Sequence, residues 1–97
     1  MTWRIKIDPR VRDKDFKKID KSQQRRILKA IKGKLGRAPE KFGKQLKGEL
    51  EKFRSLRVGN YRVIYEVKED KVLVLVIKIG IRRNEEVYKE FFKRLGN

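Results

Sequence analysis

The first part of the chain alternates between apolar and basic residues. Residues 3–7 place tryptophan or isoleucine at every second position, which is the period of a β-strand with one buried face. Asp8 and Pro9 follow directly, and an aspartate N-cap before a proline at the first helical position predicts the start of a helix. That helix is short and polar, and its apolar residues are Val11, Phe16 and Ile19.

A second helix is predicted to begin near residues 20–23. Apolar residues then recur at helical spacing and give the helix one buried face; they are Ile27, Leu28, Ile31 and Leu35. Gly36 ends this helix and Pro39 prevents it from resuming, so we expect an N-terminal pair of antiparallel helices. Residues 37–52 are rich in glycine and lysine, and we expect an irregular connection there, held in place by Phe42, Leu46 and Leu50.

Three strands are predicted in the second half of the chain, at about residues 53–58, 61–67 and 72–79. Charged residues 68–71 separate the last two, and the three strands form an antiparallel meander. Matching Val67 with Val72 assigns one face of the sheet to Val63, Tyr65, Val67, Val72, Val74 and Val76. The opposite face then carries Ile64, Leu73, Leu75 and Ile77. Both faces are apolar and need cover, one from the helical pair and the other from the C-terminal segment or from another protein.

A tight turn sets the pairing of the first two of these strands. Gly59 and Asn60 suit a two-residue turn, because glycine readily adopts the positive φ that such turns require. The turn places Val58 opposite Tyr61, Leu56 opposite Val63 and Arg57 opposite Arg62. Like charges directly opposite each other are destabilising. The two arginines either lie on a solvated face or hold an anion, and bidentate binding by guanidinium groups indicates phosphate.

The last predicted helix begins at Asn84, which suits an N-cap and precedes two acidic residues. Its apolar stripe is typical of a core or partner surface and consists of Val87, Tyr88, Phe91, Phe92 and Leu95. The whole pattern predicts a single small α+β domain over residues 1–97. Its element order is β-α-α-β-β-β-α, with a twisted antiparallel sheet packed on the N-terminal helical hairpin.

The charge of the chain indicates a polyanionic partner. Lys and Arg number 29 against 13 Asp and Glu, which gives a net charge of +16 at pH 7 on 97 residues. Because the basic residues run through nearly the whole sequence, binding to RNA or DNA is expected to be strong and to weaken with salt. We expect no membrane binding, since the short helices keep their apolar faces for the core. The chain has no cysteine, which is consistent with a cytoplasmic protein.

The residue types present restrict the chemistry. The chain has no histidine and no cysteine, which excludes Ser-His-Asp triads, histidine-based ribonuclease mechanisms and zinc sites built from these ligands. The acidic residues are scattered among basic ones, so we expect no metal and no cofactor. Arginine, lysine and tyrosine remain, and they can cleave RNA. The ribose 2′-hydroxyl attacks the adjacent phosphate, guanidinium groups stabilise the developing charge, and tyrosine or lysine moves protons.

Four segments of the sequence share the motifs and spacing of a known family. They are Leu46-Lys47-Gly48, residues 56–67, Gly80-Ile81-Arg82 and Glu86-Val87-Tyr88. Together they resemble the RelE/ParE superfamily of toxins from toxin–antitoxin systems, and its RelE branch in particular. The resemblance covers essentially the full chain. It implies a compact toxin that enters the A site of the ribosome, among rRNA, and cuts the mRNA codon there, while a cognate antitoxin protein wraps around it and silences it.

The resemblance also implies roles for particular residues. Arg62 and Arg82 match the two family arginines that stabilise the reacting phosphate. Tyr88 matches the C-terminal tyrosine that acts as a general base or orients the substrate. The residues expected to bind RNA are Lys52, Arg54, Arg57 and Arg83.

One position departs from the family pattern. RelE-type enzymes commonly carry Lys or Arg where this chain has Ser55. Lys52 or Arg54 could supply the missing cation, although strand alternation turns Arg54 to the opposite face unless a bulge intervenes. Two other functions therefore stay open. One is the ParE-like activity, which inhibits DNA gyrase and cuts nothing, and the other is a basic RNA- or ribosome-binding module without catalysis.

Overall fold

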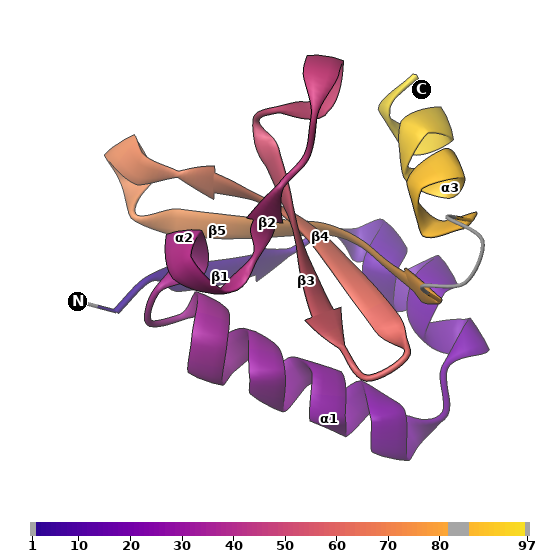
Figure 1. Ribbon diagram of the computed structural model, residues 1–97. Coiled ribbons are helices and arrows are strands. Elements are labelled where there is room, and N and C mark those ends of the chain that lie inside the picture. The colour runs from indigo at the N-terminus through magenta and orange to yellow at the C-terminus, as the bar shows by residue number, and fades with distance from the viewer. Residues whose placement is uncertain (1, 82–85, 97) are drawn as a thin grey trace.

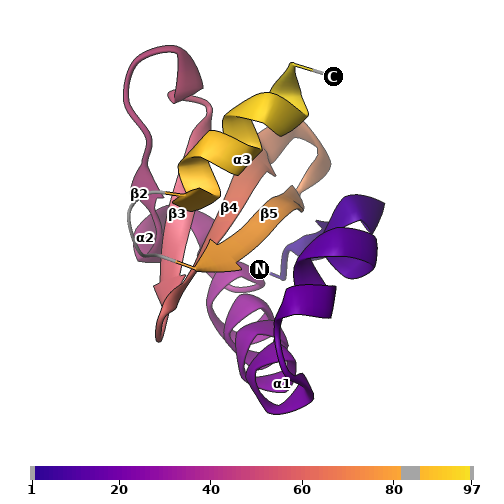
Figure 2. The same cartoon turned by 90° about the vertical axis from the view of Figure 1, so that its right-hand side faces the viewer.

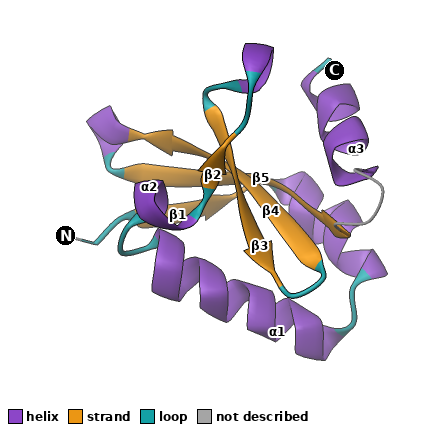
Figure 3. Ribbon diagram, viewed as in Figure 1, coloured by secondary structure: helices purple, strands orange, loops and turns teal. Residues whose placement is uncertain are grey.

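The computed structural model describes residues 2–81 and 86–96. One sheet has the strand order β1-β5-β4-β3-β2, and helices lie on both of its faces (Figures 1 and 3). The strands are β1 (Arg4–Ile7), β2 (Lys44–Gln45), β3 (Phe53–Val58), β4 (Tyr61–Lys68) and β5 (Leu73–Ile81). The α-helices are α1 (Lys21–Ala30), α2 (Pro39–Phe42) and α3 (Glu86–Leu95). The predicted α+β fold, with an N-terminal helical pair and a C-terminal helix, is confirmed.

Two aspartates begin the helices at the predicted places. The carboxylate of Asp8 accepts a hydrogen bond from the backbone N–H of Arg10 at 2.8 Å. That of Asp20 accepts one from the backbone N–H of Gln23 at 2.9 Å. Leu28, expected on the buried face of α1, is only half-buried. Short π or 3₁₀ turns complete the helical pair, at Val11–Asp15, Phe16–Lys18 and Ile31–Leu35.

The pairing of β3 with β4 agrees with the prediction. Gly59 has a φ of +58°, in the left-handed region that favours glycine. Leu56 lies opposite Val63, Arg57 opposite Arg62 and Val58 opposite Tyr61. The turn therefore brings two guanidinium groups to the same face of the sheet.

The predicted match between β4 and β5 is wrong by two residues. Val67 lies opposite Val74 and not opposite Val72. The reason is local, because Glu69–Lys71 forms a 3₁₀ turn and Val72 adopts a left-handed conformation with a φ of 50°. A shift of two residues keeps paired side chains on their predicted faces. The two apolar faces are therefore divided as expected despite the different register.

A β-bulge interrupts this pairing further along. Tyr65 lies opposite Val76 and Ile64 opposite Lys78, so that Ile77 is an extra residue on β5. Ile64 and Ile77 both pack in the core under α3. Because Lys78 is opposite Ile64, the bulge turns this lysine toward α3 as well.

Two features of the sheet go beyond the sequence prediction. β1 pairs with β5 in parallel, with Ile5 opposite Val74, whereas the other three pairings are antiparallel. The expectation of an irregular connection over residues 37–52 is also wrong in part, because that stretch contains α2 and β2. β2 adds a short edge strand to β3, with Lys44 opposite Ser55.

Each face of the sheet has its own buried core. The core against the helical pair consists of Val11, Ile19, Ile27, Ile31, Leu35, Leu56, Val58, Val63, Tyr65, Val74, Val76 and Ile79. α3 covers the other face (Figure 2), where the core consists of Phe53, Ile64, Ile77, Val87 and Phe91. The C-terminal segment therefore covers the second face. Within residues 2–81 and 86–96, no helix is long and apolar enough to cross a membrane.

Tyr65 anchors the segment that leads from α2 into β2. Its hydroxyl donates a buried hydrogen bond to the backbone carbonyl of Pro39 at 2.6 Å. Burial raises the pKa of this hydroxyl, which keeps it protonated as a donor. Gly43 provides the space, since a Cβ there would lie 2.0 Å from the hydroxyl oxygen of Tyr65.

We expect Tyr65→Phe to lower the free energy of unfolding by about 1–3 kcal/mol, because the buried carbonyl of Pro39 loses its partner. Urea denaturation followed by circular dichroism measures this change. Tyr61→Phe is the matched control, since it removes the hydroxyl of a half-buried tyrosine on the same strand. Equal losses in the two variants would contradict the prediction.

Candidate functional site

Basic and hydroxyl side chains gather on the α3 face of β3 and β4. Arg57 and Arg62 lie directly opposite each other, and Ser55, two residues before Arg57, points to the same face. The hydroxyl of Ser55 is 3.0 Å from that of Tyr88, which belongs to the first turn of α3. We refer to Ser55, Arg57, Arg62 and Tyr88 as the candidate site. The fold thus places two of the residues singled out by the resemblance, Arg62 and Tyr88, on one face.

The environment of Arg62 suits an oxyanion. Its side chain is half-buried, and its Nε is buried without a hydrogen-bond partner among the described residues. The residue opposite it on β5 is Gly80, where a Cβ would lie 3.0 Å from Cγ2 of Val87. Glycine therefore allows α3 to approach the sheet beside Arg62. An unpartnered buried donor is costly, but the Nε of Arg54 on the opposite face is in the same state. The case for an anion therefore depends on the facing guanidinium groups and not on this one atom.

Arg54 lies on the other face of the sheet. It is opposite Tyr65, and its Nη2 donates hydrogen bonds to the backbone carbonyls of Glu40 and Gly43. This follows from strand alternation, and no bulge in β3 reverses it. Arg54 therefore supports the segment before β2 and does not place a cation beside Ser55.

The other residues expected to bind RNA have different positions. Lys52 is exposed, with its Nζ 5.2 Å from the centre of the Phe53 ring. Arg57 is exposed at the candidate site. Arg82 and Arg83 lie outside the described residues, and their roles stay predictions.

The sequence reasoning missed one basic residue next to the candidate site. Lys44 on β2 is exposed and lies directly opposite Ser55. Residues 37–52 were expected to be irregular, and an irregular segment has no alternation that could assign a face to Lys44. Recognising a strand in this stretch would have revealed it.

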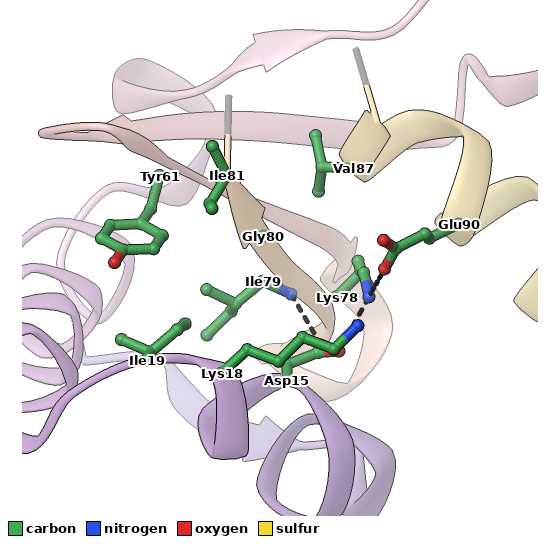
Figure 4. Close-up of a pocket in the computed structure, with 10 residues that line it drawn as sticks. All are labelled: Asp15, Lys18, Ile19, Tyr61, Lys78, Ile79, Gly80, Ile81, Val87 and Glu90. Atoms are coloured by element: carbon green, nitrogen blue, oxygen red, sulfur yellow. Dashed lines mark hydrogen bonds and ion pairs between the residues drawn. The ribbon is translucent and has the colours of Figure 1, made fainter. Parts of the chain in front are cut away.

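A buried cluster of charged side chains fastens α3 to the sheet. The carboxylate of Asp15 binds Lys78 at 2.8 Å and Arg94 at 3.0 Å. Lys78 also contacts Glu90 of α3. Figure 4 shows Asp15, Lys78 and Glu90 in the wall of a small cavity between the first helical segment (residues 11–18), β5 and α3. The one sequence signal for this cluster is Lys78, a lysine inside the otherwise apolar strand β5. Its partner Asp15 lies far away in the sequence, so the signal does not identify the ion pair.

The chain matches the sequence model of one protein family over residues 5–86, the ParE toxin of the type II toxin–antitoxin system parDE. The mRNA interferase toxin RelE of Escherichia coli is 31% identical over 83 residues, which cover 84% of this chain and 86% of the relative. A putative RelE-like toxin protein of Escherichia coli is 26% identical over 83 residues, with the same coverage.

Solved structures of related toxins have the same fold. A free mutant of the Escherichia coli toxin RelE has a TM-score of 0.75 at 26% identity, covering 98% of this chain and 99% of that one. The archaeal RelE–RelB complex from Pyrococcus horikoshii has a TM-score of 0.62 at 29% identity, covering 87% and 99%. A toxin–antitoxin complex from Mycobacterium tuberculosis has a TM-score of 0.79, covering 87% and 95%, and at 24% identity it shows likeness of fold alone.

The contact between Glu90 and Lys78 predicts a pH-dependent stability. The pKa of Glu90 is lowered from its ordinary value of 4.5, chiefly because Lys78 donates a hydrogen bond to it. Such a carboxylate stabilises the folded state above its unfolded pKa, and the contribution is lost as the pH falls through the folded pKa. Glu90→Gln is therefore expected to melt at a lower temperature than the wild type at pH 7.

Melting curves between pH 7 and pH 3 test this expectation. The difference in melting temperature between wild type and Glu90→Gln should shrink below about pH 4.5, because the Glu90 carboxylate then begins to be protonated and to lose its stabilising contact with Lys78. Glu51→Gln, which changes an exposed acid, is the control and should match the wild type. A difference that stays constant at every pH would argue against this origin of the stability.

Proposed function

The chain belongs to the RelE/ParE superfamily of toxins from type II toxin–antitoxin systems, and we propose that it is a ribosome-dependent endoribonuclease that cleaves mRNA codons in the A site. The observation that carries this proposal is the pair of opposed arginines, Arg57 and Arg62, on the same face as Tyr88. The Escherichia coli relative at 31% identity is named an mRNA interferase toxin, which supports RNA as the substrate.

Binding of the RNA follows from the charge. A net charge of +16 attracts the phosphate backbone wherever it approaches the protein. Arg57 and Arg62 provide the local site, because a phosphate between them would relieve the repulsion of their guanidinium groups. The ribosome holds the codon in place, and such positioning lowers the entropic part of the barrier.

In the proposed reaction the ribose 2′-oxygen attacks the adjacent phosphorus. A bond forms between the 2′-oxygen and phosphorus, and the bond from phosphorus to the 5′-oxygen breaks, which leaves a 2′,3′-cyclic phosphate. Tyr88 accepts the proton of the 2′-hydroxyl or orients that hydroxyl for attack. Arg62 stabilises the additional negative charge on the phosphate oxygens in the transition state. Arg82 has the same role by resemblance.

A cognate antitoxin is the proposed protein partner. α3 has apolar side chains on its outer surface, where Phe92 is 55% and Leu95 43% exposed. Exposed apolar residues that adjoin one another mark interaction surfaces. The archaeal structure, at 29% identity, is a RelE–RelB complex, which supports a bound protein partner here as well.

The description of the matching family as ParE toxins favours a second candidate function. It is inhibition of DNA gyrase, in which the basic surface binds without cleaving nucleic acid. A supercoiling assay with purified gyrase distinguishes this function from mRNA cleavage.

Arg62→Ala and Arg82→Ala are each expected to reduce mRNA cleavage by about two orders of magnitude or more, because each removes a group that stabilises transition-state charge. Primer extension on a defined mRNA in a purified translation system measures cleavage, and a reaction without ribosomes tests their requirement. Arg12→Ala is the matched control, since it removes an exposed arginine of the first helical segment. Near-wild-type cleavage by both site variants would refute the mechanism. Ribosome binding without cleavage by the wild type, together with inhibition of gyrase, would favour the second candidate.

Antitoxin is expected to raise the melting temperature of the toxin. A partner that binds only the folded state stabilises it by about 2.7 kcal/mol at a free concentration 100 times its Kd. Phe92→Ser should weaken this effect, whereas Phe42→Ser changes a phenylalanine on α2 with 49% exposure and should not. Differential scanning fluorimetry with purified antitoxin provides the measurement. An unchanged melting temperature at saturating antitoxin would count against the proposed partner.

A further inference from the structure

β2 carries a lysine at the edge of the candidate site. Lys44 lies directly opposite Ser55, and opposed residues of an antiparallel pair point to the same face, with Cβ atoms about 5 Å apart. The same row continues on β4, where Ile64 lies opposite Ser55. Because Ile64 packs under α3, the whole row, including Lys44, belongs to the α3 face.

The neighbours of Lys44 support this orientation. The backbone N–H of Leu46 donates to the carbonyl of Phe53 at 3.0 Å, so the pairing continues past β2. Leu46, two residues after Lys44, packs against the core under α3. Between them, the side-chain amide of Gln45 donates to the backbone carbonyl of Glu51. Strand alternation then gives Lys44 the same face as Leu46.

The hydroxyl pair of the candidate site therefore lies between two kinds of cation. Ser55 is 3% exposed, and its hydroxyl is 3.0 Å from that of Tyr88. The strand order β4-β3-β2 puts Arg62 on one side of Ser55 and Lys44 on the other. Lys44 is exposed and Tyr88 is only half-buried, so the Lys44 ammonium group is free to approach a phosphate bound beside Tyr88.

We propose that Lys44 is a catalytic residue that stabilises the negative charge developing on the leaving 5′-oxygen, an inference that rests on the proposed endoribonuclease function. In an in-line displacement the attacking and leaving oxygens lie on opposite sides of the phosphorus. Two cations on different sides of the phosphate therefore stabilise charge on different oxygen atoms. Arg62 binds the phosphate oxygens. As the bond from phosphorus to the 5′-oxygen breaks, the Lys44 ammonium donates a hydrogen bond to that oxygen, which then takes its proton from water.

Single-turnover cleavage of ribosome-bound mRNA at saturating toxin tests the inference. We expect Lys44→Ala to slow cleavage at least tenfold. Lys44→Arg keeps the positive charge and should stay within threefold of the wild type. Lys71→Ala controls for the loss of one charge, because it removes an exposed lysine in the turn between β4 and β5. Melting curves and ribosome binding for each variant show whether the chemical step alone has changed.

A second substrate isolates the leaving group. Replacing the bridging 5′-oxygen of the cleaved linkage by sulfur gives a leaving group that departs without charge stabilisation. The defect of Lys44→Ala should then fall below threefold, whereas that of Arg62→Ala should persist.

Three outcomes would overturn the role of Lys44 while leaving the endoribonuclease function intact. These are a Lys44→Ala defect smaller than tenfold on the oxygen substrate, a defect of threefold or more on the sulfur substrate, and a Lys44→Arg variant more than threefold slower than wild type. If the wild type cleaves neither substrate, the proposed function fails and the role of Lys44 fails with it.

Discussion

The position of α3 depends on the ion pairs that the buried carboxylate of Asp15 makes. Asp15 is 3% exposed and binds Lys78 of β5 and Arg94 of α3. Removing one partner of a buried ion pair leaves an uncompensated charge and costs about 3–5 kcal/mol, so the first helical segment, β5 and α3 keep one arrangement. Tyr88 belongs to α3, and its contact with Ser55 therefore depends on charges that lie outside the candidate site.

The two-sided core allows the sheet to hold like charges side by side. β4 pairs with β3 on one side and with β5 on the other, whereas β2 pairs with β3 only at Arg54 and Ser55. Backbone hydrogen bonds to β4 and the two apolar cores therefore determine where the side chains of β3 lie. The repulsion between Arg57 and Arg62 and the unpartnered Nε of Arg62 are tolerated within that framework. Local costs of this kind are characteristic of functional sites. Under the proposed function, a phosphate bound between the two guanidinium groups would offset their repulsion.

Several parts of the fold could be predicted because they depend on residues close together in the sequence. Gly59 determines the register between β3 and β4 through a tight turn. Asp8 and Asp20 begin helices through hydrogen bonds to backbone groups two or three residues away. The alternation of side chains along β3 also predicted correctly that Arg54 points to the face away from Ser55. The register between β4 and β5 could not be obtained in this way, since it depends on a valine, Val72, that adopts a conformation unusual for its residue type.

The sequence by itself therefore determined the fold class, the facing arginines and the two apolar faces, because periodicity and turn chemistry act over a few residues. Only the tertiary structure decided the parallel pairing of β1, the presence of β2 with Lys44 beside Ser55, and the contact of Asp15 with Lys78. Those two charged residues are 63 positions apart. Contacts over such separations are set by how whole elements pack, and no local pattern of residues encodes them.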